Sequence, residues 1–477
     1  MTNIELLDEV LRLCDIIDQV GGVAYVVGGA ARDIYRNKEL AIPLTLKDVD
    51  IEVFGMEPQA LEDLLKGYYR IDSVGKAFEV IKLHGQPIDI SVPRREVKTG
   101  DQHKDFVVTA DPFMSVEEAA SRRDFTINAI YYNPLTFEWL DPFNGGHDCV
   151  CKILRPVSSR FVEDPLRVLR GMQFIARFDL TPSEQCLAVC RILGQEHLPR
   201  ERVWEEWKKM ILHGMEWHKA MDFLLAIGWM QKYYPEIYAM RGSLQNPVWH
   251  PEGDCYEHFC LVMEAFARGV FKDDEEKLVL GLAALCHDLG KPATAEFKGT
   301  KNNPDPHWTN FNHETHLEPT YSFLARLTNE TKLVEQVCWL VKSHMKPMAF
   351  YYDSRDKPGK PIAARPDLAA VRRLACNVNL CMLAKLVRFD QGGRGPTMPP
   401  EEDALAWFLH QAEAAKVLYS KPTPLILGRD LIQQFALAPG KKMGEILKVL
   451  MEKQLSGEFS TKEEGLVIAA KLVNPLE

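Results

Sequence analysis

Asp48 and Asp50 are the side chains of this chain best suited to chemistry, and they lie a short distance behind a glycine pair. The apolar, β-branched run from Val23 to Val27 predicts a buried strand, and Gly28-Gly29 predicts the turn at which a helix begins. Two glycines let main-chain N–H groups approach a polyphosphate closely, and the positive end of the helix favours its negative charge. The stretch therefore predicts a phosphate-binding turn.

The two aspartates lie on a second predicted strand, Lys47 to Phe54. Residues two apart on a strand share a face, so both carboxylates are expected to point the same way. Paired acids repel each other unless a cation neutralises them, and carboxylate oxygens suit Mg²⁺, which bridges to substrate phosphates. An Asp-x-Asp pattern alone is more often two unrelated acids at a strand end. Combined with the glycine turn, it predicts nucleotidyl transfer at a two-metal site.

Arginines form a second motif, Ser121 to Ala129, in which Arg122 and Arg123 precede a predicted strand from Ile127 to Tyr132. Guanidinium groups make paired hydrogen bonds to phosphate, and their charge would offset that of a triphosphate. Alone, an Arg-Arg pair is usually surface charge. Together with a phosphate-binding turn, the pair predicts further contacts to a nucleotide.

A third motif, Glu163 to Arg170, opens a predicted helix with Asp164 at the cap position and Pro165 at the first helical position. Capping alone would explain Asp164. Asp164 and Arg167 are three residues apart, however, and can lie side by side as an acceptor next to a forked donor. A carboxylate accepts from the exocyclic amino group that cytosine and adenine share, whereas guanine and uracil present a carbonyl oxygen there. The pair therefore predicts selection of C and A over G and U.

Length, composition and charge limit the class of protein. With 477 residues, of which 46% are hydrophobic and 26% charged, the chain is expected to be a folded, soluble protein of about two to four domains. No apolar run is long enough for a membrane span, and the stretch from Met1 to Val20 lacks the layout of a secretion signal, so a cytoplasmic location is expected. The net charge of −10 argues against indiscriminate coating of nucleic acid.

With these motifs in order and the step Arg200-Glu201-Arg202 behind them, the chain resembles the class II tRNA nucleotidyltransferases, the bacterial CCA-adding enzymes of the DNA polymerase beta superfamily. The match runs from about Val20 to Arg202. It implies that Asp48 and Asp50 are catalytic and hold Mg²⁺, and that Asp89 is a third catalytic carboxylate. Nucleotide-binding roles are implied for Gly28, Gly29, Arg32, Arg122, Asp124, Asn128, Asp164, Arg167 and Arg170.

A second cluster lies in the C-terminal half, where His287-Asp288 resembles the signature of HD-type metal-dependent phosphohydrolases. The resemblance implies a metal that activates water for attack on a phosphoester. Imidazole and carboxylate ligands suit Mn²⁺, Ni²⁺, Fe²⁺ or Zn²⁺, with Mg²⁺ as a further choice. The implied ligands are His258, His287, Asp288, His313, His344 and Asp390, with His316 as an additional candidate and Lys291 as a phosphate contact.

The resemblance also gives the expected architecture, because it includes His250 to Asp254 and the tail from Ile426 to Gly440. The fold class is α+β, with an N-terminal DNA polymerase beta-like nucleotidyltransferase head followed by an all-α neck and body, an HD-type helical domain and a helical tail. Strand-like runs to about Asn133 and helical spacing after Phe161 agree with it. Expected boundaries are 1–150 for the head, 151–240 for the neck and body with the base-selecting motif, 241–400 for the HD domain and 401–477 for the tail.

These observations predict a tRNA nucleotidyltransferase that adds or repairs the 3′ CCA end, with an additional HD phosphohydrolase activity on terminal or 2′,3′-cyclic phosphates. Its expected partners are the tRNA 3′ end, ATP and CTP, with no DNA and no membrane. Three alternatives stay open: a bacterial poly(A) polymerase, an HD hydrolase whose nucleotidyltransferase-like part binds RNA, and a plain RNA-binding module. The tail from Ser456 to Glu477 lacks the basic character of the first, and the intact Asp48 and Asp50 disfavour the second. The acidic net charge and the paired metal motifs disfavour the third. The sequence leaves open full or partial CCA addition, the HD metal and the oligomeric state.

Overall fold

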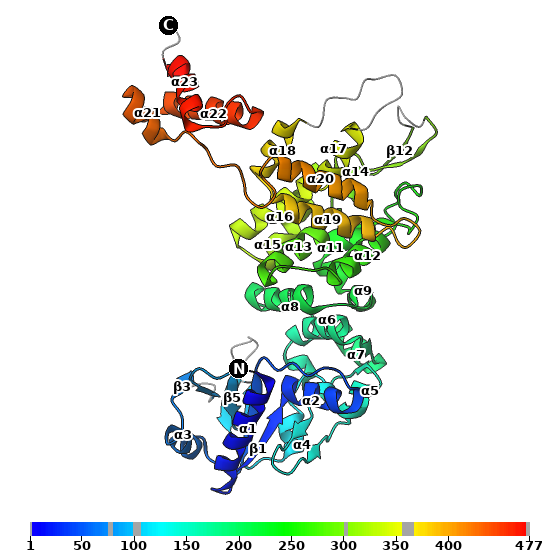
Figure 1. Cartoon of the computed structure of the whole chain (residues 1–477). Coiled ribbons are helices and arrows are strands. Elements are labelled where there is room, and N and C mark those ends of the chain that lie inside the picture. Colours follow the sequence, from blue (N-terminus) through cyan, green and yellow to red (C-terminus); the bar gives the residue numbers. More distant parts are fainter. Residues whose placement is uncertain (1, 75–79, 99–105, 300–303, 355–366, 474–477) are drawn as a thin grey trace. The chain divides into compact units, whose positions relative to one another are not determined.

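The computed structural model describes residues 2–74, 80–98, 106–299, 304–354 and 367–473, which are coloured along the chain in Figure 1. The chain divides into two compact units after Tyr233. None of the helices in the described ranges is long and apolar enough to cross a membrane. The first unit holds the aspartate and arginine motifs, and the second holds the histidine cluster.

A seven-stranded mixed sheet frames the first unit, in the order β3-β4-β5-β2-β1-β8-β9. Its strands are β1 (Val23–Val27), β2 (Val49–Phe54), β3 (Ile71–Val74), β4 (Val80–Leu83), β5 (Ile88–Ser91), β8 (Tyr131–Tyr132) and β9 (Trp139–Leu140). β1 and β2 are antiparallel with Val27 opposite Asp50, and β2 and β5 are parallel with Asp50 opposite Asp89. This register places the glycine turn and two of the predicted catalytic carboxylates next to one another.

Apolar helix faces cover the sheet. The helices of this part are α1 (Asn3–Asp18), α2 (Gly28–Leu40), α3 (Pro58–Lys66), α4 (Val116–Ala120) and α5 (Gly145–Val150), and β6 (Arg94–Lys98) pairs separately with β7 (Phe106–Ala110). α1 carries Leu6, Val10 and Leu13 at helical spacing, and they belong to one buried cluster with the sheet residues Val26 and Ile51. This core fixes the strand ends from which the site is built.

A helical part completes the first unit. Its helices are α6 (Leu166–Phe178), α7 (Glu184–Arg191), α8 (Arg200–His213), α9 (Trp217–Ala226) and α10 (Trp229–Tyr233). α6 packs against α8 and α9. Its buried residues include Val168, Met172 and Ile175, each fully buried, so the arginines of α6 lie outside this packed face.

The second unit is built around one apolar helix. Its elements are α11 (Pro235–Ala239), α12 (Cys255–Ala267), α13 (Asp274–Cys286), α14 (Lys291–Thr294), β12 (Glu296–Lys298), β13 (His307–Thr309), the 3-10 helix η3 (His313–Thr315), α15 (Glu318–Leu327), α16 (Thr331–Ser343), α17 (Lys346–Ser354), α18 (Leu368–Ala375), α19 (Leu380–Gly392) and α20 (Glu402–Ala414). α13 packs against α12, α16 and α19, and every residue from Val279 to Cys286 is buried. The later turns of α13, from Val279 onward, are apolar on all sides and lie in the core, and they lead directly into His287.

The C-terminal helices have a small core of their own. They are α21 (Gly428–Phe435), α22 (Lys441–Ser456) and α23 (Lys462–Val473). Leu431, Leu450 and Ala469, one from each helix, belong to the same buried cluster. A guanidinium hydrogen bond from Arg372 of α18 to the Leu455 carbonyl, at 3.0 Å, ties this tail to the helical region before it.

The expected α+β class is confirmed, and the strand from Val23 to Val27 matches its prediction residue for residue. The strand predicted from Ile127 to Tyr132 is wrong over most of its length, because Thr126–Asn128 forms a 3-10 turn (η1) and only Tyr131–Tyr132 (β8) is extended. The helical region after Phe161 also contains the short strands β11 (Thr181–Pro182), β12 and β13. β11 pairs with β10 (Ile153–Leu154), which precedes this region, and β12 pairs with β13, placing Phe297 opposite Trp308. Strands of two or three residues are too short to leave an alternating pattern in the sequence.

Candidate functional site

The glycine turn and Asp50 enclose one small space in the first unit. Gly28 has a φ of +65°, a backbone conformation that residues with a Cβ rarely adopt. A Cβ at this position would lie 3.3 Å from Asp50 Oδ2 and 3.4 Å from Arg123 Nη1. Gly29 follows as the second residue of α2. Glycine therefore keeps this space open for a ligand group that approaches the backbone and the start of the helix.

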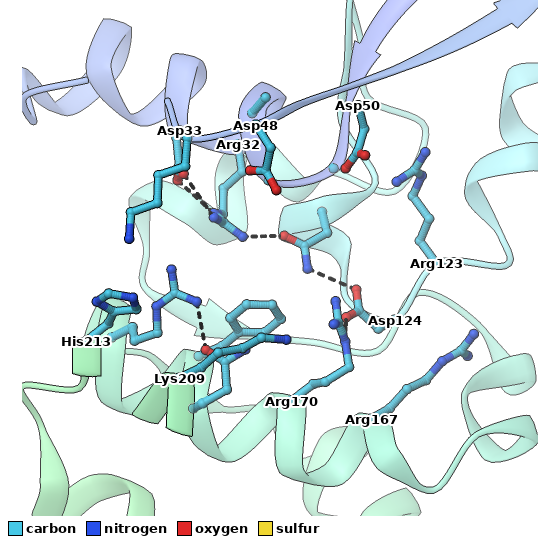
Figure 2. Close-up of a pocket in the computed structure, with 18 of the residues that line it drawn as sticks. Arg32, Asp33, Asp48, Asp50, Arg123, Asp124, Arg167, Arg170, Lys209 and His213 are labelled. Carbon is cyan, nitrogen blue, oxygen red and sulfur yellow. Dashed lines mark hydrogen bonds and ion pairs between the residues drawn. The ribbon is translucent and has the colours of Figure 1, made fainter. Parts of the chain in front are cut away.

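Asp48 and Asp50 both face the pocket in Figure 2. Burial raises the pKa of Asp50, and Arg123 opposes that rise. The negative charges of Asp48 and Asp89 raise it further. Asp89 lies beside Asp50 in the sheet, and its carboxylate accepts a hydrogen bond from Lys82 at 2.9 Å. Carboxylates that disfavour one another's ionisation are relieved by a divalent cation, and their oxygens are the ligands that Mg²⁺ prefers, so these residues fit Mg²⁺.

A pocket of about 750 Å³ lies between these carboxylates and the helical part of the same unit. Figure 2 shows Asp48 and Asp50 along one wall and Arg167 and Arg170 along the other. The basic lining residues are Arg32, Lys47, Arg122, Arg123, Arg167, Arg170, Arg177, Arg202 and Lys209, and the acidic ones are Asp33, Asp48, Asp50, Asp124 and Asp164. The excess of cations gives the pocket the charge that attracts a polyanion such as a nucleoside triphosphate.

One hydrogen-bond chain joins four of the predicted binding residues. Arg32 Nη1 donates to Asn128 Oδ1 at 2.7 Å, and Asn128 Nδ2 donates to Asp124 Oδ1 at 2.9 Å. Arg170 Nε donates to the other Asp124 oxygen at 2.7 Å. Arg32 also pairs with Asp33 and is only 4% exposed. The chain fixes Arg32 and Arg170 on facing walls of the pocket, as Figure 2 shows.

Asp124 is the internal anchor of this chain. Burial alone would raise its pKa, but the charge of Arg170 and hydrogen bonds from Asn128 and the Phe125 N–H lower it below the ordinary value. Both of its oxygens accept from protein groups. In this structure Asp124 therefore accepts hydrogen bonds from Asn128 and Arg170 and holds both side chains in place.

Asp164 and Arg167 both line the pocket, but different partners hold them. Asp164 Oδ2 accepts from Arg202 Nη2 at 2.8 Å. Arg167 donates to the carbonyl oxygens of Arg160 and Arg122 at 2.8 and 2.6 Å. Each side chain is thus fixed in the pocket wall independently of the other.

The predicted start of this helix is wrong by one residue. α6 begins at Leu166 with Pro165 as its cap residue, and Asp164 has an extended backbone, with φ −131° and ψ 99°. The Leu166 N–H still donates to Asp164 Oδ1 at 3.1 Å, so the carboxylate caps the helix from one position further out. Because Asp164 precedes the helix, the three-residue spacing does not place the side chains of Asp164 and Arg167 next to each other on one helix face.

Sequence reasoning missed residues that enter the pocket from α6 and α8, namely Arg177, Lys209 and His213. Arg177 Nη1 donates to Gln173 Oε1 at 2.9 Å, and burial together with the positive charge of Arg32 lowers the pKa of Arg177 to about 10. One signal was available for α8. Its polar residues at positions 202, 206, 209 and 213 recur at three- and four-residue spacing and mark one face of the helix.

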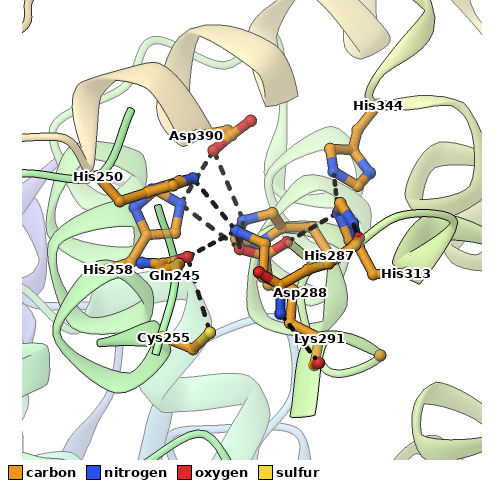
Figure 3. Close-up of polar contacts among 12 residues, drawn as sticks. Gln245, His250, Cys255, His258, His287, Asp288, Lys291, His313, His344 and Asp390 are labelled. Carbon is orange, nitrogen blue, oxygen red and sulfur yellow. Dashed lines mark hydrogen bonds and ion pairs between the residues drawn. The ribbon is translucent and has the colours of Figure 1, made fainter. Parts of the chain in front are cut away.

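A cluster of buried histidines and aspartates occupies the second unit (Figure 3). Its residues come from separate elements: His258 from α12, His287 and Asp288 directly after α13, His313 from η3, His344 directly after α16, and Asp390 from α19. Their ligand atoms form two groups, within each of which all lie within 4.8 Å of one another: His258, His287 and Asp390, and Asp288, His313 and His344. The fold thus brings together six residues of which the first, His258, and the last, Asp390, are 132 positions apart in the sequence.

Backbone carbonyls set the tautomers of three histidines. Nδ1 of His287, His313 and His344 lies 2.7, 2.7 and 2.6 Å from the carbonyl oxygen three residues earlier. A carbonyl only accepts, so each Nδ1 carries the proton and each Nε2 offers a lone pair. Nε2 of His313 faces Nε2 of His344 at 3.2 Å. Burial and the neighbouring histidines lower the pKa of His344 to about 3, so its Nε2 keeps a lone pair that a metal ion could use.

Buried polar atoms without a well-formed hydrogen bond also indicate a metal site in this cluster. His287 Nε2 and both oxygens of Asp288 are buried without a well-formed hydrogen bond to any described residue. Asp288 Oδ1 lies 3.2 Å from His313 Nε2, and Oδ2 lies 3.2 Å from His287 Nε2 and 2.6 Å from Lys291 Nζ. Imidazole nitrogens and carboxylate oxygens lie within 4.8 Å of one another in each of the two groups, and Nδ1 of His287, His313 and His344 faces a backbone carbonyl. This donor set fits a divalent transition metal.

Two residues beside the cluster were not predicted as part of it. Glu252 Oε1 lies 2.9 Å from His250 Nδ1 and 2.7 Å from His258 Nδ1. His258 Nε2 faces Asp390 Oδ1 at 3.0 Å. Glu252 therefore orients the His258 ring so that Nε2 points into the cluster. The predicted candidate His316 is exposed and belongs to neither ligand group.

A pocket of about 690 Å³ reaches this cluster. Asp288, His313, His344 and Asp390 lie among its lining residues, and so do the aromatic residues Trp249, Trp308, Phe311 and Tyr352. Apolar walls beside a few polar groups suit a phosphoester that carries a flat or apolar group.

Comparison with known proteins identifies two matching families. The poly A polymerase head domain family matches residues 24–155, and the HD domain family matches residues 255–378. The multifunctional CCA protein of Stenotrophomonas maltophilia strain K279a is 34% identical to the chain over 328 residues, which are 66% of this chain and 74% of that protein.

Solved structures show where the fold recurs. The Bacillus stearothermophilus CCA-adding enzyme in complex with CTP has a TM-score of 0.64 and 19% identity, over 100% of this chain and 98% of that one. The Thermotoga maritima CCA-adding enzyme complexed with tRNA has a TM-score of 0.54 and 19% identity, over 100% of this chain and 99% of that one. At this identity the likeness establishes the shared fold.

Proposed function

Because the chain belongs to the family of the multifunctional CCA proteins, we propose that it is a tRNA nucleotidyltransferase that adds or repairs the 3′ CCA end from CTP and ATP. The observation that carries the proposal is the pairing of Asp48 and Asp50 with the open turn at Gly28, inside a pocket rich in arginine. A tRNA substrate agrees with a cytoplasmic location.

In the proposed reaction the 3′ hydroxyl oxygen of the RNA attacks the α-phosphorus of the nucleotide, and pyrophosphate leaves. Arg32 and the start of α2 would hold the phosphates, and Asp89 would accept the proton of the hydroxyl. When bound at Asp48 and Asp50, two Mg²⁺ ions would stabilise the attacking and leaving oxygens. The protein contributes mainly positioning and preorganised charge.

The second unit would hold a phosphohydrolase that acts on terminal or 2′,3′-cyclic phosphates of RNA or nucleotides. Its buried cluster would bind Mn²⁺, Ni²⁺, Fe²⁺, Zn²⁺ or Mg²⁺ through the two ligand groups. We place the functional division at 1–150 for the head, 151–240 for the neck and body, 241–400 for the HD domain and 401–477 for the tail. The two family matches, at residues 24–155 and 255–378, support the placement of the head and of the HD domain.

Product mapping tests the proposed function. A tRNA that lacks its last three nucleotides is supplied with each nucleoside triphosphate, singly and in pairs, and the 3′ ends are sequenced. We expect CTP alone to extend the end by C only, and CTP with ATP to complete CCA and then stop. Continued addition of A would identify the rival poly(A) polymerase, and no addition with a folded protein would favour an RNA-binding part without transferase activity.

Asp164→Ala is expected to weaken base selection. The carboxylate is the acceptor fixed at the pocket wall, and it would receive the amino group of cytosine or adenine while opposing the carbonyl of uracil or guanine. We expect the ratio of kcat/KM for CTP over UTP to fall by about 10- to 100-fold, the cost of a mismatched buried hydrogen bond. Single-turnover incorporation of each nucleotide gives this ratio.

Arg202→Gln is the matched control, because it removes the partner of Asp164 and keeps the acceptor. If Asp164 acts only by holding Arg202, both variants will slow all four nucleotides alike and leave the ratio unchanged. That outcome would remove Asp164 from the proposed base contact.

Glu252→Gln is expected to weaken metal binding in the second unit by about 10- to 100-fold, the usual effect of losing a carboxylate that orients a ligating histidine. Titration of the metal-free protein with Mn²⁺ measures the change. Glu264→Gln, on α12 like His258 but paired with Arg268 at 3.7 Å, serves as the control and is expected to bind as the unaltered protein does. Equal affinity in both variants would contradict the assigned role of Glu252.

A further inference from the structure

Glu52 is a buried carboxylate for which the proposed reaction has no use. It lies two residues beyond Asp50 on β2, and it is only 2% exposed. Asp50 and Glu52 are two residues apart on β2 and so share a face of the strand, but Asp50 lines the pocket and Glu52 is covered. A buried carboxylate is costly unless it is paired and hydrogen-bonded, so its partners are informative.

Three donors converge on Glu52. Tyr131 Oη donates to Oε2 at 2.7 Å, and Arg123 Nη2 lies 3.3 Å from the same oxygen. Arg122 Nη2 lies 3.4 Å from the other oxygen. Arg123 Nε also donates to Tyr131 Oη at 3.4 Å, and its guanidinium lies over the ring of Tyr131 at 5.3 Å. Glu52 and Tyr131 therefore hold Arg123 by its charge, its hydrogen bonds and its flat face.

The remaining nitrogen of Arg123 faces Asp50. Arg123 Nη1 and Asp50 Oδ2 lie 3.4 and 3.3 Å from the same point, the Cβ position that Gly28 leaves vacant. Figure 2 shows the guanidinium of Arg123 beside the carboxylate of Asp50. Arg123 thus lies between two carboxylates, one buried in the protein and one expected to bind a metal ion. A cation that closes on Asp50 would compete with that ion for the same oxygens.

We propose that Glu52, together with Tyr131, is a positioning residue that holds Arg123 back from Asp50 and so keeps the carboxylate available to the divalent cation. The inference rests on the proposed function only in taking Asp50 as a metal ligand. The arginine then has two positions: held by Glu52 in the unaltered protein, or drawn to Asp50 when Glu52 is replaced by a neutral side chain.

The test is Mn²⁺ binding, read by electron paramagnetic resonance with an unreactive CTP analogue present. The full chain carries His287→Ala and Asp288→Ala throughout, so that the second cluster does not contribute to the signal. Glu52→Gln keeps the size of the side chain and its acceptor for Tyr131, and it removes the charge. We expect the apparent Kd for Mn²⁺ to rise about tenfold or more, as Arg123 transfers its ion pair to Asp50.

A double-mutant cycle separates this role from a purely structural one. When Arg123 is already Gln, no competing cation remains, so adding Glu52→Gln is expected to change the Kd by less than about twofold. Tyr131→Phe, which removes one hydroxyl, provides a milder second variant and is expected to raise the Kd by about threefold. An unchanged Kd in folded Glu52→Gln, or an undiminished effect in the Arg123→Gln background, would overturn the proposal.

Mn²⁺ binding needs no tRNA, so failure of the inference about Glu52 can be distinguished from failure of the proposed function. A protein that shows this coupling but adds neither C nor A to tRNA would refute the proposed function and keep the inference. A protein that completes CCA but lacks the coupling would refute the inference alone.

Discussion

Asp48→Ala and Asp50→Ala are each expected to lower the rate of C and A incorporation by at least about a thousandfold, because each removes a proposed ligand of the metal ions that would stabilise the attacking and leaving oxygens. Each variant also relieves repulsion at the site, since the charge of Asp48 raises the pKa of Asp50. We therefore expect the melting temperature to stay unchanged or to rise slightly while activity is lost. Single-turnover extension of truncated tRNA measures the rate, and thermal unfolding measures stability.

Asp63→Ala is the matched control. Asp63 is an exposed aspartate of α3 in the same unit and lies 3.8 Å from Lys66. Its replacement is expected to leave the rate within about twofold, as is usual for an exposed ion pair. Full activity in folded Asp48→Ala and Asp50→Ala, taken singly and together, would remove both aspartates from catalysis.

Replacing His287 and Asp288 together by alanine is expected to abolish metal binding in the second unit and any phosphohydrolase activity there. The two residues belong to different ligand groups of the cluster, so the double change disrupts both. We expect bound transition metal to fall to background, and hydrolysis of p-nitrophenyl phosphate and of a 2′,3′-cyclic nucleotide to fall by at least about a thousandfold. CCA addition is expected to continue at the unaltered rate, because its predicted residues all lie before Tyr233.

His316→Ala controls for the loss of an imidazole, since His316 is exposed and outside both ligand groups. It is expected to retain metal and hydrolysis. Equal loss of transfer and hydrolysis in the double variant would show that the two activities depend on one site. Retention of stoichiometric metal would show that His287 and Asp288 are not its ligands.

The parts of the first site that could be predicted from the sequence are those coded by adjacent residues. The β-branched run ending at Gly28 predicted β1 and the start of α2. The strand predicted from Lys47 begins only at Val49, so Asp48 lies just before β2, although both Asp48 and Asp50 line the pocket as expected. Both predictions need only the pleat of a strand and the conformational freedom of glycine. The sequence pattern could not predict that Val27 pairs with Asp50, because register depends on contacts between separate strands.

Asp164 and Arg167 show how a local rule fails at an element boundary. Their spacing implies neighbouring side chains only if both residues are helical, and the extended backbone of Asp164 removes that condition. Its partner, Arg202, lies 38 residues further along the chain. A contact of that range comes from the packing of α8 against α6 and leaves no periodic signal between the two residues.

Glu52 and Glu252 were missed for a related reason. Glu52 lies two residues beyond Asp50, and Glu252 lies shortly before His258 in the sequence. Each contacts a side chain that it can orient, Arg123 for Glu52 and His258 for Glu252. Glu52 contacts Tyr131, which is 79 residues away, and Glu252, in the irregular segment before α12, contacts His258. Spacing identifies groups that face a ligand together, whereas supporting residues become visible only when the fold shows their partners.

Metal binding by Asp48 and Asp50 can be seen directly in a crystal of the protein grown with Mn²⁺ and an unreactive CTP analogue, examined by anomalous scattering. We expect metal peaks in contact with the carboxylates of Asp48 and Asp50 and with the phosphates of the nucleotide. Bound nucleotide with both carboxylates turned away from it, and with no anomalous peak beside them, would show that these aspartates do not hold the metal.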